Sequence, residues 1–433
     1  YKNNRILFYY SLKNKFHKVS FRDAVMQGVA NDGGLFFPNK INKLERSIIT
    51  NIEDISNEEI AYQCLRQFVD SEIPNEVLNS IIHEVYKLPI SMVDISKNIS
   101  VLELFNGPTM AFKDFGAIFM ARCMEYFISN GYSNEITILV ATSGDTGAAV
   151  ANAFHKIKGI NVIILYPSKK VSFIQEQQIS TLNDNITAIE YDGTFDDCQS
   201  AVKKALLDKD LCKKFNFTTS NSINIGRWLP QIVYYFIGYK LLNKTSNNLA
   251  FSVPSGNYGN LFAGMISKRM GLPIGKFISS NNSNNVVDIY MKTQKYMPKA
   301  SIETISNAMD VGDPSNFIRI EELYKTYNNL KDDMYTCSYS DEDTISAILE
   351  LYSNYNYLSD PHGAVGYLGA KEFVNSNDDF NCIFLGTAHP SKFVDIVENI
   401  ISEKIVLPEQ IKSCLNKSIK VEFIKSYKEL KSY

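Results

Sequence analysis

Short apolar runs alternate with amphipathic stretches along most of the chain after residue 95. The apolar runs lie at residues 99–105, 136–141, 161–166, 186–191, 249–253 and 382–385. Strands that are buried on both faces and covered by helices produce this alternation. The pattern therefore predicts a doubly wound α/β fold built on parallel sheets, whose ligands lie at the carboxyl ends of the strands.

The first 95 residues follow a different pattern. A strand-like apolar run at residues 6–10 is followed by helical spacing between Phe21 and Val29 and by an Asn-Asp-Gly-Gly turn at 31–34. Helical patterns then cover residues 58–68 and 74–86, the second with a proline at its first turn. We predict a small, mostly helical N-terminal domain over residues 1–95.

Composition restricts the partners of the chain. Its 433 residues are 45% hydrophobic and carry a net charge of -3, without a Lys/Arg block of the kind that follows a nucleic acid backbone. No apolar run approaches the roughly 18 residues of a membrane helix. The seven cysteines are scattered and the five histidines form no ligand cluster, which favours reduced thiols and no metal site. The chain begins at Tyr1 rather than methionine, so we expect that a few leading residues precede it.

Two of the predicted strands run into glycine-rich turns. The first turn reads Thr-Ser-Gly-Asp-Thr-Gly at 142–147, and the second reads Ser-Gly-Asn-Tyr-Gly-Asn at 255–260. Open backbone amides at a helix N-terminus bind anions, and Ser143 and Thr146 add hydroxyl donors. Taken alone, each turn is as typical of a plain strand-to-helix connection as it is of an anion site. Neither matches a phosphate-binding P-loop or a dinucleotide fingerprint, which argues against nucleotide hydrolysis and dinucleotide binding.

A lysine in apolar surroundings is the candidate nucleophile. Lys113 follows an Asn-Gly-Pro-Thr turn at 106–109 and lies between Phe112 and Phe115. Burial would lower the pKa of this amine and make it reactive at neutral pH, as a Schiff-base lysine requires. The alternative is a surface lysine whose stem lies along the two rings. Near the end of the chain, Thr387 either donates a hydrogen bond into a cleft or caps the following helix.

Three further polar features have structural interpretations. We expect His389, beside a proline, to be a packing or hydrogen-bonding residue, and residues 360–363 to form a turn. The asparagine-rich stretch at 281–285 is typical of a flexible polar loop.

Taken together, these motifs resemble those of the threonine synthases, pyridoxal-phosphate enzymes with the tryptophan-synthase-like fold. The resemblance is carried by residues 106–114, 142–147, 255–260 and 387–390, with further agreement at 27–35, 221–224, 231–236 and 311–316. Within this family, the chain is more similar to the longer-chain branch, which has an added N-terminal domain, than to the shorter one. The resemblance implies two α/β domains around a cleft: a large cofactor-binding domain at 96–130 and 215–433, and a smaller domain at 131–214.

The resemblance also implies a set of site residues. Lys113 would hold pyridoxal 5'-phosphate as an internal aldimine and act as general base. The cofactor phosphate would bind at Gly256, Asn257, Tyr258, Gly259 and Asn260; Tyr258 stands where phenylalanine is common. Thr387 would face the pyridine nitrogen, and Asp145 would lie near the phenolic oxygen. Ser143, Gly144 and Thr146 would line the substrate side, and Thr109 would contact the substrate carboxylate. Arg227 would either bind the substrate phosphate or form a surface or interdomain salt bridge.

The implied activity is that of a carbon-oxygen lyase in threonine biosynthesis. O-phosphohomoserine and water would give L-threonine and phosphate through γ-elimination followed by β-addition of water. Three alternatives stay open: a phospho-lyase giving 2-oxobutyrate, a serine or threonine dehydratase, and a non-catalytic phosphometabolite-binding relative. We expect a cytoplasmic monomer or homodimer that acts on a small molecule and has no nucleic acid or membrane partner.

Overall fold

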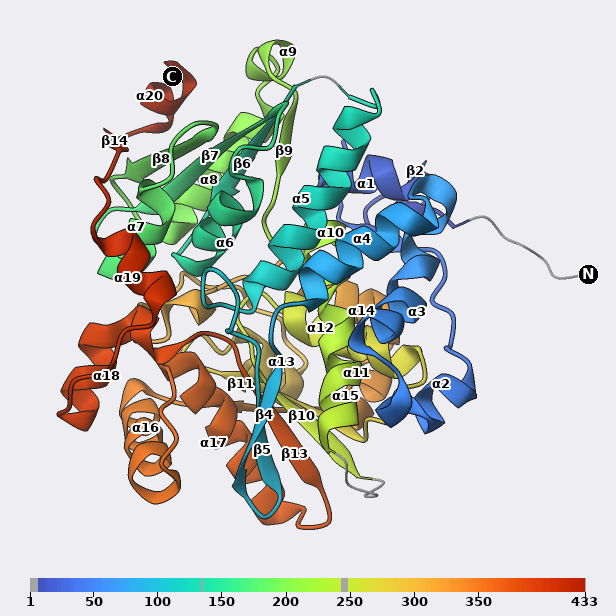
Figure 1. Cartoon of the computed structure of the whole chain (residues 1–433), viewed down its shortest axis with the longest axis vertical. Helices are drawn as coiled ribbons and strands as arrows, with labels where there is room; N and C mark the ends of the chain where they lie inside the picture. Colours follow the sequence, from blue (N-terminus) through green and yellow to red (C-terminus); the bar gives the residue numbers. More distant parts are fainter. Residues whose placement is uncertain (1–6, 134, 243–247, 433) are drawn as a thin grey trace, which may run out of the picture.

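The computed structural model describes residues 7–133, 135–242 and 248–432. Two predominantly parallel sheets form separate α/β units, and a small antiparallel sheet lies among the N-terminal helices. Figure 1 shows the smaller parallel sheet at the upper left, the larger one at the bottom and the N-terminal helices at the right. The arrangement confirms the predicted doubly wound α/β fold.

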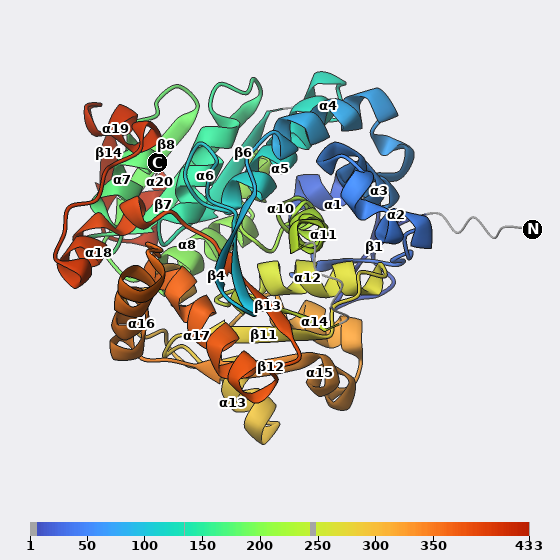
Figure 2. The same ribbon diagram turned by 60° about the horizontal axis from the view of Figure 1, so that its bottom comes forward.

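The larger sheet has six strands in the order β12-β11-β10-β13-β5-β4. Their bounds are Met334–Ser338, Lys276–Asn281, Leu249–Pro254, Asn381–Gly386, Ile99–Glu103 and Ser91–Ser96. All neighbouring pairs are parallel except β4 with β5. The helices α11 (Gln231–Leu242) and α12 (Gly259–Arg269) cover one face, and α17 (Pro361–Ser376) covers the other (Figure 2). Accordingly, Phe251 packs on Tyr235 of α11, whereas the next residue, Ser252, donates to a carbonyl of α17.

The smaller sheet has five parallel strands in the order β14-β8-β7-β6-β9. They span Val421–Ile424, Ile186–Tyr191, Ile160–Pro167, Ile136–Ala141 and Phe217–Thr219. The outer strands β14 and β9 come from residues beyond the range 131–214 that the sequence suggested for this domain. The expected domain limits stay a prediction, and the pairing of β14 with β8 extends the smaller unit to the C-terminal region.

The N-terminal part combines helices with a short sheet. Strands β1 (Tyr9–Ser11), β2 (Lys18–Val19) and β3 (Phe36–Pro38) pair antiparallel, beside α1 (Phe21–Gln27), α2 (Arg46–Thr50), α3 (Asn57–Val69) and α4 (Asn75–Tyr86). The predicted helices at 58–68 and 74–86 are therefore confirmed. Of the predicted strand at 6–10, Ile6 lies outside the described residues.

Further helices connect and cover the strands. They are α5 (Lys113–Ser129), α6 (Asp145–Phe154), α7 (Phe173–Ser180), α8 (Phe195–Leu207), α9 (Leu211–Lys214), α10 (Ile225–Trp228), α13 (Val286–Thr293), α14 (Phe317–Tyr324), α15 (Tyr327–Asp333), α16 (Asp341–Tyr355), η4 (Pro390–Phe393), α18 (Val394–Ile401), α19 (Glu409–Leu415) and α20 (Tyr427–Ser432). No helix within the described ranges is long and apolar enough to cross a membrane.

The asparagine-rich stretch is ordered rather than a flexible loop. Asn281 ends β11, and the side chain of Asn282 is buried and donates to Thr304 and Asp310. Asn284 also bonds Asp310 and the carbonyl of Ile302. These amides satisfy the backbone of the 302–310 segment, so their polarity reflects buried hydrogen bonding and the prediction of flexibility was wrong.

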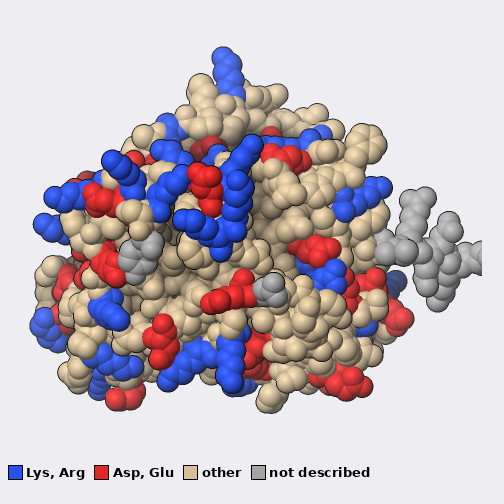
Figure 3. All heavy atoms as spheres, turned by 90° about the horizontal axis from the view of Figure 1, so that it is seen from above, with Lys and Arg blue, Asp and Glu red and all other residues tan. Residues whose placement is uncertain are grey.

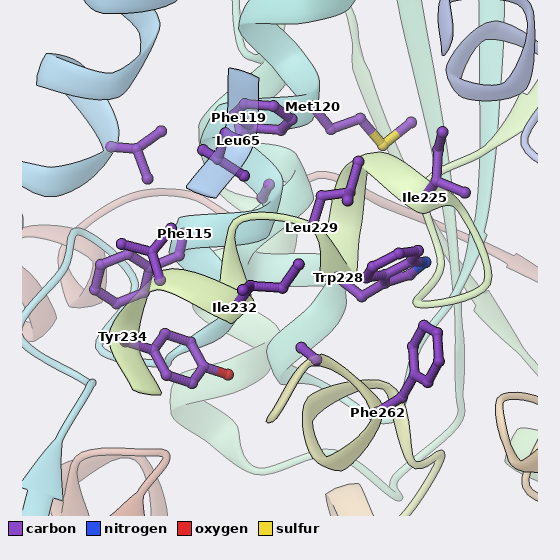
Figure 4. Close-up of a cluster of buried hydrophobic side chains, with 14 of the residues drawn as sticks. Leu65, Phe115, Phe119, Met120, Ile225, Trp228, Leu229, Ile232, Tyr234 and Phe262 are labelled. Atoms are coloured by element: carbon purple, nitrogen blue, oxygen red, sulfur yellow. The ribbon is translucent and has the colours of Figure 1, made fainter. Parts of the chain in front are cut away.

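One apolar cluster joins the N-terminal part to the larger unit. Trp228 of α10 is fully buried, and its ring meets that of Phe262 of α12 edge-on at 4.7 Å between centroids. Phe115 of α5 meets Tyr234 of α11 at 5.9 Å, and Leu65 of α3 closes the cluster from the N-terminal side (Figure 4). The start of α5, where Lys113 lies, is thus fixed by packing.

Charges of both signs are interspersed on the face that carries α9 and α20, with Lys and Arg residues gathered toward its upper part (Figure 3). In α20, Lys431 lies 2.7 Å from Asp208 and 3.5 Å from Asp210. Such exposed pairs contribute little to stability.

A buried arginine joins the N-terminal sheet to the larger unit. Arg319 of α14 has no exposed surface, and its guanidinium donates to the Phe36 carbonyl at 3.0 and 3.1 Å and to the Ile223 carbonyl at 2.6 Å. Asn316 accepts a further bond from it. One side chain therefore satisfies carbonyls from two distant segments.

We predict that Arg319→Met lowers the free energy of unfolding by about 3 kcal/mol, because the two buried carbonyls lose their donors. The shift of the urea unfolding midpoint measures this change. Arg46→Met, at an exposed position of α2, is the matched control and should leave the midpoint almost unchanged. Equal midpoints for the two variants would contradict the assigned role of Arg319.

Candidate active site

One cavity gathers loops from both parallel sheets. It is lined by the start of α5, by the turns after β6 and β10, by Thr387 after β13 and by the 308–311 segment. The carboxyl ends of strands from the two sheets thus meet at one place, as the doubly wound fold predicts.

Lys113 is the first residue of α5 and lines this cavity. Its side chain is 16% exposed, and Nζ lies 5.4 Å from the centre of the Phe112 ring. Burial lowers the pKa of this amine; the positive charges of Lys392 and Arg227 act in the same direction, and Asp145 opposes them. The pKa thus moves as the sequence predicts, toward an amine that is uncharged more often at neutral pH.

The turn after β6 is closed by its own threonine. The Thr142 hydroxyl accepts from the amides of Gly144 and Gly147 at 3.0 and 2.8 Å. Gly144 has φ of 131°, and a Cβ there would lie 2.2 Å from the Gln175 side chain, so only glycine fits. In the described chain, no hydrogen bond engages the hydroxyls of Ser143 and Thr146, which both line the cavity.

The turn after β10 leaves a row of amides open. Within the described ranges, the backbone N–H groups of residues 256–261 make no hydrogen bond. Tyr258 has φ of 62°, and its hydroxyl bonds Ser279 and Asn281, away from the cavity. The N-terminus of α12 therefore presents open donors and the positive end of its dipole to the cavity.

Asn260 adds a side-chain donor to this row. Its Oδ1 accepts from the hydroxyls of Tyr234 and Tyr235 at 2.6 and 2.8 Å. Its Nδ2 is buried and has no partner among the described residues. Since both hydroxyls hold the oxygen, the amide nitrogen is left for a ligand acceptor.

Asn257 and Thr387 complete two walls of the cavity. The Asn257 side chain donates to Ser222 and accepts from the Ser315 amide, which fixes the loop. Thr387 lines the cavity, and its carbonyl accepts from the Phe112 amide at 2.9 Å. The following helix η4 is capped by His389, so Thr387 is not its cap.

Asp145 is the electrostatic centre of the site. Its Oδ2 lies 3.7 Å from Lys113 Nζ, and its Oδ1 lies 2.8 Å from Lys392 Nζ. Burial would raise the pKa of this carboxyl, but Lys392, Lys113 and His362 together hold it well below its usual range. Asp145 is therefore ionised.

Thr109 is not brought to the cavity lining. It is 3% exposed, and its hydroxyl and amide both donate to the Asp114 carboxylate. Its carbonyl accepts from Lys392 and Gln178. Each polar group of Thr109 is thus engaged within the protein, and its contact with the substrate carboxylate stays a prediction. Gly144 likewise is absent from the lining and shapes the turn.

The site contains residues that sequence reasoning left aside or interpreted structurally. His362 lines the cavity, with Nδ1 2.6 Å from Asp360 and Nε2 accepting from the Ala308 amide. It was expected only as part of a turn, and Asp360 does cap α17 there. Lys392 had no signal, because a lysine in a Pro-Ser-Lys-Phe run resembles any surface lysine.

Arg227 has no carboxylate partner. It is 2% exposed, lines the cavity and donates from Nη1 to the Ser220 carbonyl, while Nε is buried without a partner. In the described part of the chain no salt bridge includes it, so the salt-bridge alternative was wrong. Burial lowers the pKa of Arg227 to about 10. The Asp114 carboxylate acts on Arg227 only through space, so a buried guanidinium without an ion pair among the described residues calls for an anionic ligand.

Three family models match the chain. The model described as "Pyridoxal-phosphate dependent enzyme" matches residues 95–381, the one for the threonine synthase N terminus matches 8–86, and the one for the threonine synthase C-terminal region matches 363–433. The matches together span nearly all of the chain.

Curated relatives and solved structures agree with these models. The chain is 44% identical to the threonine synthase of Buchnera aphidicola subsp. Schizaphis graminum, over 93% of this chain and 94% of that protein. It superposes on the crystal structure of threonine synthase from Escherichia coli with a TM-score of 0.92 and 38% identity, covering 99% of each chain. The pyridoxal-phosphate-bound threonine synthase from Brucella melitensis gives a TM-score of 0.90 and 30% identity, covering 99% of this chain and 98% of that one.

These matches confirm the resemblance drawn from the motifs and the pyridoxal-phosphate cofactor that it implied. By its cavity, its whole-length relatives and its fold, the chain belongs to the threonine synthase family of pyridoxal-phosphate dependent enzymes.

Proposed function

We propose that this chain converts O-phosphohomoserine and water into L-threonine and phosphate in the cavity around Lys113. The observation that carries the proposal is the coincidence in one cavity of three features. They are a buried amine of lowered pKa, an open row of amides at 256–261 and the unpaired guanidinium of Arg227. Two separate anion sites beside one reactive amine match a phosphorylated cofactor together with a phosphorylated substrate.

The residues present fit pyridoxal phosphate. Lys113 supplies the amine for the covalent link, and the amides of residues 256–259 with Asn260 Nδ2 supply donors for the cofactor phosphate. The orphaned Asn260 nitrogen is the specific sign, because a buried donor without a partner is costly. Thr387 offers an uncharged hydroxyl to the pyridine nitrogen, and Asp145 serves the phenolic side. Of Tyr258, only the backbone serves the ligand.

The opposite wall fits the substrate. Ser143 and Thr146 offer free hydroxyls, and Arg227 offers its unpaired guanidinium to the substrate phosphate. We assign the substrate carboxylate to the amides of Ser143, Asp145 and Thr146, which have no hydrogen-bond partner among the described residues, in place of Thr109, whose polar groups are engaged.

The chain's own residues act mainly by moving protons and holding anions. When bound, pyridoxal phosphate supplies an electron sink for the electrons left at the substrate Cα. Lys113 Nζ takes the proton from Cα and later returns one, which its lowered pKa permits near neutral pH. Arg227 holds the phosphate that leaves Cγ, and the 308–311 segment, tied to His362, covers the cavity against bulk water. Cβ loses a proton as the Cγ–O bond to phosphate breaks, and Cγ then gains a proton. Water adds its hydroxyl at Cβ, and its remaining proton goes to the released phosphate.

Among the alternatives, the synthase is favoured over the phospho-lyase by relatives that are all named threonine synthases. A dehydratase of unphosphorylated serine or threonine would leave the Arg227 guanidinium without an anion. A non-catalytic binding protein would have no use for a buried lysine of lowered pKa.

We also propose that the protein acts in the cytoplasm, supported by seven cysteines that are all unpaired. Its oligomeric state, monomer or homodimer, stays a prediction.

Lys113→Ala should abolish the long-wavelength absorbance of the lysine-bound cofactor and reduce threonine formation by on the order of 10³-fold or more. Absorbance spectra and an assay of threonine against 2-oxobutyrate, both from O-phosphohomoserine, measure the two effects. Lys158→Ala, at an exposed position, is the control. Retention of both properties by Lys113→Ala would refute the assignment, and 2-oxobutyrate as the main product of the unaltered chain would favour the phospho-lyase.

Arg227→Met should raise the KM for O-phosphohomoserine roughly 10- to 100-fold, because a charged hydrogen bond to the phosphate is lost. The absorbance of the lysine-bound cofactor should not change. Steady-state kinetics and spectra on the same preparation separate these effects, and Arg122→Met, whose side chain pairs with Glu84 on the surface, is the control. An unaltered KM would remove Arg227 from the substrate site.

The double variant Tyr234→Phe/Tyr235→Phe should weaken cofactor binding about 10-fold. Without the two hydroxyls, the Asn260 amide is no longer held with its nitrogen toward the phosphate. Titration of the apoprotein with pyridoxal phosphate gives the dissociation constant. Tyr239→Phe, on the same helix, is the matched control. If both proteins bound the cofactor equally, Asn260 would not depend on the tyrosines.

A further inference from the structure

Lys392 is a fully buried lysine behind Asp145, outside the cavity lining. It lies in η4, after β13 of the larger sheet, and has no exposed surface. Its Nζ donates to Asp145 Oδ1 and to the Thr109 carbonyl, each at 2.8 Å. The Lys392 carbonyl in turn accepts from the Ser172 hydroxyl at 2.7 Å. A lysine is rarely buried without a specific anionic partner, and here Asp145 is that partner.

The ion pair crosses between the two α/β units. Asp145 begins α6, which covers the smaller sheet, whereas Lys392 follows a strand of the larger sheet. Gln175 also donates to Asp145 Oδ1 at 3.0 Å. Oδ1 is therefore occupied twice within the protein, which turns Oδ2 toward Lys113 Nζ at 3.7 Å.

The two lysines compete for one carboxylate. A carboxylate beside Lys113 favours the protonated amine, and a cation beside it opposes protonation. The Lys392 contact is about 0.9 Å shorter than the Lys113 contact, from 2.8 against 3.7 Å, so Lys392 has the stronger interaction with Asp145. The positive charge of Lys392 therefore offsets part of the negative charge that Asp145 exerts on Lys113.

Other charged groups face this cluster and do not replace Lys392. Arg227 acts on Lys113, and His362 acts on Asp145. Asp114 and His389 both lie within the field of Lys392. None of these four groups forms an ion pair with Asp145 in the described part of the chain, in which Lys392 and Lys113 are its partners.

We propose that Lys392 is a positioning residue that holds Asp145 toward Lys113 and balances its charge, so that the carboxylate orients the Lys113 nitrogen without drawing a proton onto it. The proposal rests on the function proposed above only in assigning Lys113 to the cofactor. Lys392 itself touches neither substrate nor cofactor, because Asp145 and Thr109 take up its amine.

The test is a pH titration of the absorbance of the lysine-bound cofactor in purified holoenzyme. In Lys392→Met, the midpoint should rise by about one pH unit, because Asp145 then acts on the Lys113 nitrogen alone. Asp145→Asn should lower the midpoint by a similar amount, and the double variant Asp145→Asn/Lys392→Met should return within about half a unit of the unaltered protein. Lys392→Arg, which keeps the charge, should restore most of the midpoint. A lysine that merely held the two units together would leave the Lys392→Met midpoint equal to that of the unaltered protein.

A second pair of variants and a control complete the test. Lys392→Met could fail to fold because Asp145 is left unpaired. In that case the double variant Asp145→Asn/Lys392→Met is compared with Asp145→Asn, since the two proteins differ only in the Lys392 charge. Equal midpoints in these two proteins would overturn the proposal. Lys240→Met, which removes a half-buried lysine far from the cavity, is the control and should titrate like the unaltered protein. The titration needs no turnover, so absence of threonine formation would refute the proposed function and leave this result independent.

Discussion

The active site depends on how a cluster of buried charges is balanced. Lys113, Lys392 and Arg227 bring positive charge, and Asp145 and Asp114 bring negative charge, all of them buried or nearly so. Burial raises the pKa of Asp114 to about 6, while the hydrogen bonds from Thr109 favour its ionised form. Uncompensated charges would be expensive here, and removing one partner of such a pair usually costs more than the pair contributes. The positions of the surrounding loops follow from this constraint.

The two glycine-rich turns solve different problems with similar sequences. In the turn after β6, two amides donate to the Thr142 hydroxyl. These bonds fix the shape of the turn that carries Asp145. The turn after β10 keeps its amides at 256–261 open and fixes its shape through Asn257 and Tyr258 side chains. An open amide row can bind a dianion, whereas a closed turn places a carboxylate. The backbone hydrogen bonds therefore distinguish the two turns, as the proposed cofactor and substrate sides require.

Patterns in the amino-acid sequence predicted most of the strands and singled out Lys113 as the candidate lysine. Strands β5, β6, β7, β8, β10 and β13 coincide with apolar runs, because both of their faces are buried. Strands β11 and β12 were not predicted. In β11, the apolar pattern is interrupted by Ser279, Ser280 and Asn281, whose side chains form buried hydrogen bonds. Glycine-rich motifs located both turns.

Residues whose roles come from distant partners could not be predicted. Thr109 looked available until Asp114 and Lys392 took up its polar groups, and Lys392 has meaning only through Asp145, far away in sequence. The predicted turn at 360–363 is instead the start of α17, with Asp360 as its N-cap, and no sequence pattern indicated the contact between His362 and Ala308. Arg227 was recognised as a candidate, but only the absence of a salt bridge to its buried guanidinium among the described residues decided between the two interpretations.

The pairing of β14 with β8 has a consequence for how the chain is made. Strand β8 ends at Tyr191, but its outer neighbour begins at Val421, so ribosomal synthesis must add the whole larger sheet before the smaller one is finished. During that interval the backbone of β8 is an open edge, the kind of surface that pairs with foreign strands. The nascent chain therefore passes through a stage in which the smaller sheet has an exposed edge that only the last residues of the chain can cover.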